Sequence, residues 1–250
     1  MKRLAIVFGT VLAVAPAAAQ SIAIPSYATP GSTTWQTWAA YPATVKIMIV
    51  NLNNGDDLSF YPAVQSAIQL AQASGIKVFG YTYTSYAQRD PAAVKRAIDA
   101  VRTNYGVNGI FLDQAPTSCT ASTPFGATTY QYYQDLSAYV RASGGIAVFN
   151  PGTAPATNCW MPIADILVTY ENSGITNYVY RYTDLAWMHN YSADRFWHLL
   201  YSVKQQKDMQ TAFKLARQRN AGWIYVTSDG DDGNPWNGVP TYWSAEVRQP

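Results

Sequence analysis

The sequence predicts a single (β/α)8 barrel of the TIM type, because short β-rich runs alternate along the chain with amphipathic helical patterns. Several of these runs are nearly continuous apolar stretches, which is typical of parallel strands buried on both faces. Eight such runs are found, at residues 22–27, 46–52, 77–83, 109–114, 145–150, 166–171, 196–202 and 222–228. Eight parallel strands are the number that closes such a barrel.

The first nineteen residues form a pattern of their own. Lys2 and Arg3 precede an apolar stretch over residues 4–15, and Ala17, Ala18 and Ala19 follow it. This is the pattern of a secretory signal peptide, removed near Ala19. Its apolar stretch is shorter than the roughly 20 residues that span a bilayer. We therefore expect a secreted or periplasmic protein without a membrane anchor, with a mature chain of residues 20–250.

Helical periodicity separates the predicted strands. Apolar residues recur at positions i, i+3, i+4 and i+7 in two segments, at Val64, Ala67, Ile68 and Ala71, and at Val94, Ala97, Ile98 and Val101. Asp90 and Pro91 are an N-cap and first-turn pair. Gly75 and Gly106 stand where a helix end needs a left-handed residue.

The connection between the fifth and sixth runs differs from the others. It is short, rich in Pro and Thr, and contains Cys159, so one helix is expected to be missing or reduced there. The alternation continues to the eighth run and a last amphipathic turn over residues 242–247. Without a linker or low-complexity tract, residues 20–250 are predicted to form one barrel domain.

Composition narrows the class of partner. Removing Lys2 and Arg3 lowers the basic count from 17 to 15, which equals the 15 acids, so the mature chain has no formal net charge. This argues against nucleic acid or an anionic membrane as the main partner. Aromatic residues (14%) outnumber charged ones (13%), a composition that suits neutral carbohydrate because Tyr and Trp offer flat apolar faces with polar tips. A Tyr-rich core explains the same composition equally well.

The chain has two cysteines and two histidines. Cys119 and Cys159 predict one disulfide in an exported chain. His189 and His198 lack metal-ligand spacing to each other or to a cysteine, so neither a metal nor a cofactor is expected. Without a suitably placed Ser and His pair, acyl-transfer chemistry also loses support.

Polar residues stand at or just beyond the ends of the predicted strands, where barrel enzymes place their chemistry. They are Asn51, Tyr81, Tyr83, Asp113, Gln114, Asn150, Glu171 and Asp229. Tyr27 and Trp236 are further candidates for stacking on a sugar ring. All ten are therefore candidate site residues.

Asp113 and Glu171 are the candidates for catalysis. Each closes an apolar run, and Glu171 is one of only two glutamates in the chain. Glycoside hydrolysis generally needs one carboxyl group to protonate the departing oxygen and another to attack the anomeric carbon or activate water. A separation of roughly 5 to 5.5 Å predicts retention of configuration, and roughly 6.5 to 9.5 Å predicts inversion.

Structural alternatives remain open for these residues. Asp113 can cap a loop or helix, and Glu171 can pair with an arginine. Asn150 either orients a sugar hydroxyl or makes ordinary turn chemistry before Pro151. The segment SDGDDGNP, which contains Asp229, is typical of a turn, although its acids leave calcium binding open.

Seven motifs in order resemble the spherulin-4-like, or spherulation-specific, family, which includes glycoside hydrolase family 135. They are IPSYATPG, IVNLNNG, FGYTYTSYAQR, GIFLDQAP, FNPGT, VTYEN and IYVTSDGDDGNPWNGVPTYW, and they cover most of the mature chain. The resemblance implies a (β/α)8 fold and a secreted endo-acting hydrolase of α-1,4-linked N-acetylgalactosamine or galactosamine in microbial exopolysaccharide or biofilm. By position, it makes Asp113 the nucleophile and Glu171 the general acid/base of a retaining galactosaminidase.

One position departs from the family pattern. An acid commonly follows the aspartate, but here Gln114 follows Asp113. Glutamine can bind a substrate through hydrogen bonds but cannot titrate, so this exchange is expected to alter rate or substrate preference. It also supports the alternative function, a noncatalytic polysaccharide-binding or coat protein on the same barrel. In either case we expect a monomer.

Overall fold

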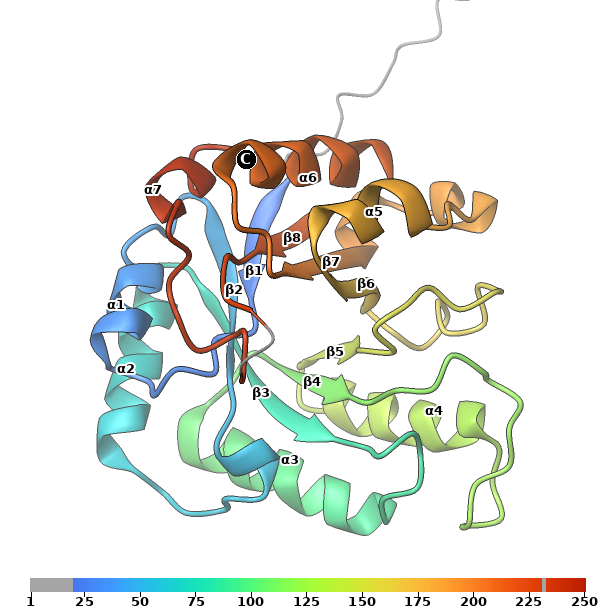
Figure 1. The fold of residues 1–250 in the computed structure, drawn as a ribbon. Helices are drawn as coiled ribbons and strands as arrows, with labels where there is room; N and C mark the ends of the chain where they lie inside the picture. Colours follow the sequence, from blue (N-terminus) through green and yellow to red (C-terminus); the bar gives the residue numbers. More distant parts are fainter. Residues whose placement is uncertain (1–19, 231–232) are drawn as a thin grey trace, which may run out of the picture.

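The computed structural model describes residues 20–230 and 233–250 and confirms the predicted closed barrel of eight parallel strands (Figure 1). Each strand pairs with its sequence neighbours, and β1 closes the ring against β8. Each of the eight predicted runs overlaps one strand. The strands are β1 (Ser21–Ile24), β2 (Val45–Val50), β3 (Lys77–Tyr83), β4 (Gly109–Asp113), β5 (Ile146–Phe149), β6 (Ile166–Ser173), β7 (Phe196–Tyr201) and β8 (Trp223–Val226).

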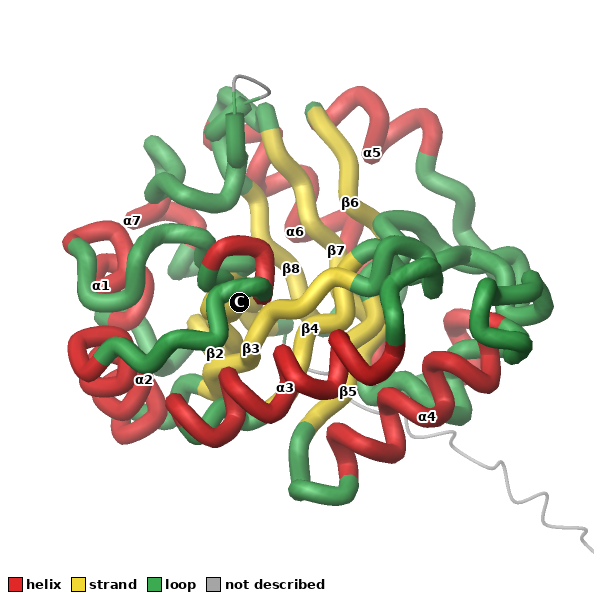
Figure 2. Tube along the Cα trace, turned by 90° about the horizontal axis from the view of Figure 1, so that it is seen from below, coloured by secondary structure: helices red, strands yellow, loops and turns green. Residues whose placement is uncertain are grey.

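Helices cover the outer surface of the barrel. Figures 1 and 2 both show α3 and α4 on the outer side of β3, β4 and β5. The α-helices in the described part of the chain are α1 (Thr33–Ala39), α2 (Pro62–Ala73), α3 (Pro91–Tyr105), α4 (Thr129–Arg141), α5 (Ile175–Arg181), α6 (Gln206–Gln218) and α7 (Trp243–Glu246). Short 3-10 turns are η1 (Asn53–Gly55), η2 (Ala186–Asn190) and η3 (Ala193–Arg195).

The predicted helix signals are confirmed. The Asp90 side chain accepts a hydrogen bond from the Ala92 N–H at 3.0 Å, which caps the N-terminus of α3. Gly106 ends the same helix with φ of 62°, and Gly75 follows α2 with φ of 95°. The apolar stripes of α2 and α3 are buried against the barrel.

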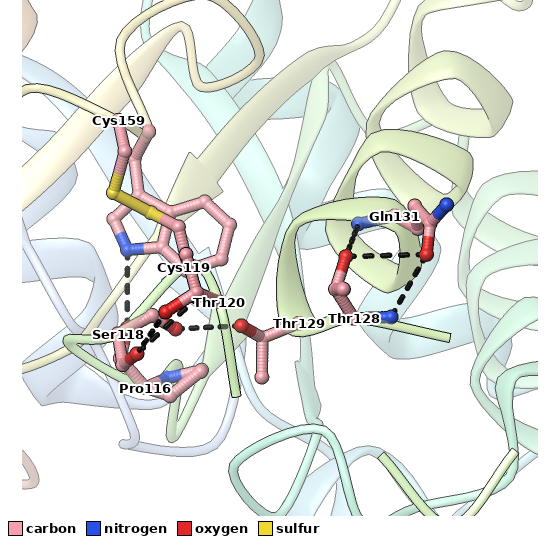
Figure 3. Close-up of a disulfide and its surroundings, with 9 residues drawn as sticks. Pro116, Ser118, Cys119, Thr120, Thr128, Thr129, Gln131 and Cys159 are labelled. Carbon is pink, nitrogen blue, oxygen red and sulfur yellow. Dashed lines mark hydrogen bonds between the residues drawn. A yellow bond between two sulfur atoms is a disulfide. The ribbon is translucent and has the colours of Figure 1, made fainter. Parts of the chain in front are cut away.

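No α-helix lies between β5 and β6, as expected, because residues 150–165 form turns and loops. A disulfide between Cys119 and Cys159 ties this segment to the loop after β4, with Cα atoms 6.3 Å apart (Figure 3). The Trp160 indole N–H also donates to the Pro116 carbonyl at 3.1 Å. The predicted disulfide therefore joins two loops that both begin at the carboxyl end of a strand.

Aromatic side chains fill much of the barrel interior. Phe111 packs against Tyr81 and Trp197, with ring centroids 6.2 and 5.6 Å apart. A second cluster, which includes Tyr133, Phe149 and Trp160, packs between strands and helices on the β4–β5 side. The Tyr-rich composition thus has a structural role in the core.

Within the described residues, no helix is long and apolar enough to cross a bilayer. The predicted signal peptide over residues 1–19 lies outside the described residues, and so do two acids of the SDGDDGNP segment, at positions 231 and 232.

Candidate active site

Three neighbouring strands place polar side chains at one end of the barrel. Asp113 is the last residue of β4, Asn150 directly follows β5, and Glu171 lies near the end of β6. In a closed parallel barrel the carboxyl ends of all strands meet at the same face. The predicted acids are therefore separated by one strand, and Asn150 occupies the end of that strand.

Asn150 joins the two acids. Its side-chain amide nitrogen donates to Asp113 Oδ1 at 2.8 Å and to Glu171 Oε2 at 2.7 Å. Since both oxygens bond the same nitrogen, they can be separated by at most the sum of these distances, about 5.5 Å. The Asn150 carbonyl oxygen atom Oδ1 accepts from the Gly152 N–H at 2.9 Å, which fixes the orientation of the amide. The turn and site interpretations of Asn150 are thus compatible.

Tyrosines surround the Asp113 carboxyl group. The Tyr81 hydroxyl donates to Asp113 Oδ2 at 2.6 Å. The Tyr27 ring meets the Tyr81 ring edge-on, with centroids 5.5 Å apart. Each carboxyl oxygen of Asp113 therefore accepts one side-chain hydrogen bond, and the Tyr27 ring packs against Tyr81.

The surroundings raise the pKa of both acids. Burial raises the pKa of Glu171 to about 7, and the nearby Asp113 charge adds to this, while hydrogen bonds from Asn150 and Trp236 oppose it. Burial also raises the pKa of Asp113, against donors that include Tyr81 and Asn150. Burial and the Asp113 charge thus both favour the protonated form of Glu171. Two acids with different protonation states are what acid-assisted displacement requires.

An open cleft of about 420 Å³ reaches Glu171. Trp236 lines it, and the Trp236 side chain lowers the pKa of Glu171. The backbone of Trp236 also accepts from the Tyr27 N–H at 2.9 Å, which links the loop after β8 to the end of β1. Sequence reasoning missed five residues of this cleft: Ser173, Tyr201, Gly230, Gly233 and Pro235. Tyr201 ends β7, so the strand-end rule contains the signal for it.

A glycine allows the loop after β2 to approach the site. Gly55 has φ of 77°, and a Cβ atom there would lie 2.6 Å from the Tyr81 backbone oxygen. Any side chain would therefore push this loop away from β3. The IVNLNNG motif thus supports the strand that carries Tyr81.

The remaining candidates lie near the strand ends, but among the described residues no side-chain hydrogen bond joins them to either acid. The Tyr83 ring lies beneath the Arg89 guanidinium, 4.1 Å away. Gln114 is exposed and has φ of 55°. The Asn51 side-chain oxygen is buried without a partner in the described part of the chain. Burial raises the pKa of Asp229, and the neighbouring Lys204 opposes this.

The structural alternatives for the two acids can be compared with this geometry. The ion pairs found among the described residues involve Asp56, Asp135, Asp99, Asp165 and Asp184, and none involves Glu171. The described residues also contain no group of three metal-ligating side chains. The geometry therefore favours paired acids over an arginine-bound glutamate.

Comparison with known proteins extends this description. The model of spherulation-specific family 4 matches residues 21–249. Spherulin-4 from Physarum polycephalum is 31% identical over 157 residues, which are 60% of this chain and 44% of that protein. The chain thus covers less than half the length of this relative.

Solved structures share the fold. Sph3 from Aspergillus clavatus, crystallised in complex with GalNAc, superposes with a TM-score of 0.76 at 21% identity, over 92% of this chain and 97% of that one. A chitinase from Rhizomucor miehei superposes with a TM-score of 0.53 at 12% identity, over 88% of this chain and 97% of that one. At such identities the likeness shows the barrel fold. Because the family model covers nearly all of the described barrel, the chain belongs to spherulation-specific family 4.

Proposed function

We propose that this protein is a secreted, endo-acting glycoside hydrolase whose two catalytic groups are Asp113 and Glu171. The observation that carries the proposal is the Asn150 amide, which bonds both carboxyl groups and holds their nearest oxygens within about 5.5 Å. Retaining glycosidases place their acids roughly 5 to 5.5 Å apart. The geometry therefore supports a retaining mechanism.

In this mechanism the Asp113 carboxylate attacks the anomeric carbon while Glu171 donates its proton to the departing glycosidic oxygen. The bond to the leaving saccharide breaks, and a glycosyl ester forms on Asp113. Glu171, now ionised, takes a proton from water, and the resulting nucleophile cleaves the ester. Asn150 and Tyr81 orient the Asp113 oxygens for attack.

The proposed substrate is α-1,4-linked N-acetylgalactosamine or galactosamine in microbial exopolysaccharide. Family membership and the GalNAc complex of Sph3 support this choice. Tyr27, Tyr81 and Trp236 supply aromatic surface beside the acids, while Asn51, Tyr83, Gln114 and Asp229 are proposed to contact substrate further along the same face. The chain is proposed to act as a monomeric barrel over residues 20–250, exported after signal-peptide removal near Ala19.

Product analysis tests the proposal. Purified protein is incubated with a panel of amino-sugar polymers, and NMR follows the first anomer released. We expect oligosaccharides from an α-1,4-galactosamine-type polymer, with the α-anomer formed first. Release of the β-anomer first would contradict the retaining assignment, and release from no polymer would contradict the hydrolase.

A second candidate function is noncatalytic polysaccharide binding, which Gln114 favours because it replaces an acid common in the family. Binding of the same polymers without any reducing-end release would support it.

A further inference from the structure

A second cavity lies on the other side of β6 from the active-site cleft. Successive residues of a strand face opposite sides. From Tyr170 onward, Glu171 and Ser173 accordingly line the cleft, whereas Tyr170 and Asn172 line a cavity of about 320 Å³; Thr169, at a register irregularity of β6, lines this cavity too. Its other walls come from the loop after β5, from the end of α5 and from the segment that follows α5. Figure 1 shows α5 on the outer side of β6. One strand separates the two spaces.

The lining of this second cavity suits a saccharide. Thr153, Thr183, Asn172 and Tyr182 are among the residues that line it. Tyr170 is only 8% exposed and its hydroxyl is buried, so its ring contributes apolar wall. Ligand sites typically combine apolar walls with a few such polar groups.

The charge of the second cavity is opposite to that of the cleft. Arg181 is the one charged side chain among the described residues that line it. The closest acid in sequence, Asp184, is bound to His189 at 2.9 Å. Behind the cavity, the Arg219 guanidinium lies 4.2 Å from the Tyr182 ring centroid. Arg181 therefore gives the cavity lining a positive charge, and Asp184, between the lining residues Thr183 and Leu185, is the nearby acid.

Gly152 connects the second cavity to the catalytic groups. It lines the cavity, and its carbonyl accepts from the Glu171 N–H at 2.8 Å. Its own N–H donates to the Asn150 side chain at 2.9 Å. A polymer that crosses the end of β6 would thus place one saccharide unit at the acids and another beside Arg181.

We infer that this cavity is a distal subsite of the polymer, and that Arg181 determines its specificity by disfavouring a positively charged amino sugar. The subsite takes a saccharide unit that is neutral or anionic. This inference rests on the proposed function, since it assigns a place for the polymer beyond the cleft.

Charge reversal at Arg181 tests the inference. Affinity is measured at low ionic strength for two samples of one polymer, neutral and partly de-N-acetylated. For Arg181→Glu we expect affinity for the cationic sample to rise about 10-fold relative to the neutral one, and the gain to shrink with added salt. Arg96→Glu is the matched control, because Arg96 is exposed on α3 and makes no ion pair in the described part of the chain. An equal gain in both variants would overturn the inference, because overall charge would then explain it.

A second variant separates the subsite from the active site. Thr183→Trp places a bulky ring at an exposed position of the cavity. We expect it to raise KM for long polymer more than for short oligosaccharides, by about 10-fold in the ratio. An unchanged ratio would contradict the subsite. Binding is measured independently of hydrolysis, so loss of the Arg181 effect and absence of any activity are distinguishable results.

Discussion

The two glutamates of this chain both have a raised pKa, yet only one faces a cleft. Glu171 shares the Asn150 amide with Asp113 and lines an open space of about 420 Å³. Glu246, in α7, is fully buried; one of its oxygens accepts from the Val226 N–H at 3.0 Å, and the other has no partner in the described part of the chain. Burial raises the pKa of both.

The comparison shows that a raised carboxyl pKa does not by itself identify a catalytic acid. Perturbed pKa values mark functional sites only in combination with access and a partner group. Glu171 has a cleft and a second acid within reach, whereas Glu246 accepts a backbone N–H at the end of β8. Substitution of Glu246 therefore serves as the control for substitution of Glu171.

The largest expected difference concerns activity. Glu171→Gln should lower the rate of reducing-end release at least about 1,000-fold, because the leaving oxygen loses its proton donor. Glu246→Gln should leave this rate within about 2-fold of wild type. Colorimetric measurement of reducing ends on both variants checks this. Equal losses in the two variants would show that the effect arises from folding.

Removal of the bridging amide should have the next largest effect. Asn150→Ala takes one donor from each acid and is expected to lower kcat about 30-fold while polymer binding is retained. The pKa of Glu171 should rise, since Asn150 lowers it in the wild type. A pH-rate profile whose upper limb stays in place would show that Asn150 does not act through Glu171.

The pH dependence of the wild type should reflect the same pair. Glu171 must be protonated, so activity should fall about 10-fold for each pH unit well above 7, where burial places its pKa. Asp113 must be ionised, so activity should also fall as pH decreases through its raised pKa. Initial rates across pH check this. A flat profile on the alkaline side would remove the proton-donor role of Glu171.

The pH dependence of stability should report the burial of Glu246. Its folded-state pKa lies above its unfolded value of about 4.3, so its stabilising contribution is complete below that pH and is lost as pH rises towards the folded pKa. In the wild type this gives a slope of up to about 1.4 kcal/mol per pH unit in the free energy of unfolding. Glu246→Gln should remove that part of the slope, measured by urea titration at several pH values. The same slope in both proteins would mean that Glu246 ionises without cost.

Much of the fold follows from local pattern. The strand runs, the stripes on α2 and α3, the cap at Asp90 and the missing helix after β5 each depend on nearby residues, so the sequence predicts them. The disulfide followed from the cysteine count in a chain predicted to be exported. The second cavity could not be predicted, because it depends on how far α5 lies from the loop after β5.

The site was predictable in part for the same reason. Strand ends identified Asp113, Asn150 and Glu171 together, because parallel strands end at one face. The shared Asn150 amide depends on side-chain orientation and distances that spacing does not contain. Tyr83 shows the limit, since alternation puts Tyr81 and Tyr83 on the same face of β3, yet the Tyr83 ring lies beneath Arg89 while Tyr81 donates to Asp113.

The smallest expected effect concerns Gln114. Its side chain is exposed and no hydrogen bond joins it to the acids within the described residues, so Gln114→Glu should change kcat by less than about 3-fold. It should favour a partly de-N-acetylated polymer over a neutral one, because it adds a negative charge at the same face. Kinetics on both polymer forms measure this, and unchanged values on both would exclude a role for this position in substrate preference.

The most direct test of the paired acids is the rate of reducing-end release by Asp113→Asn, compared with wild type at matched polymer saturation. The amide keeps the shape of the side chain and its contact with Tyr81 but cannot form the glycosyl ester. A loss of at least about 1,000-fold with polymer affinity retained is the predicted result. Release within a few-fold of wild type would contradict the assignment of Asp113 as the nucleophile and, with it, the two-acid mechanism.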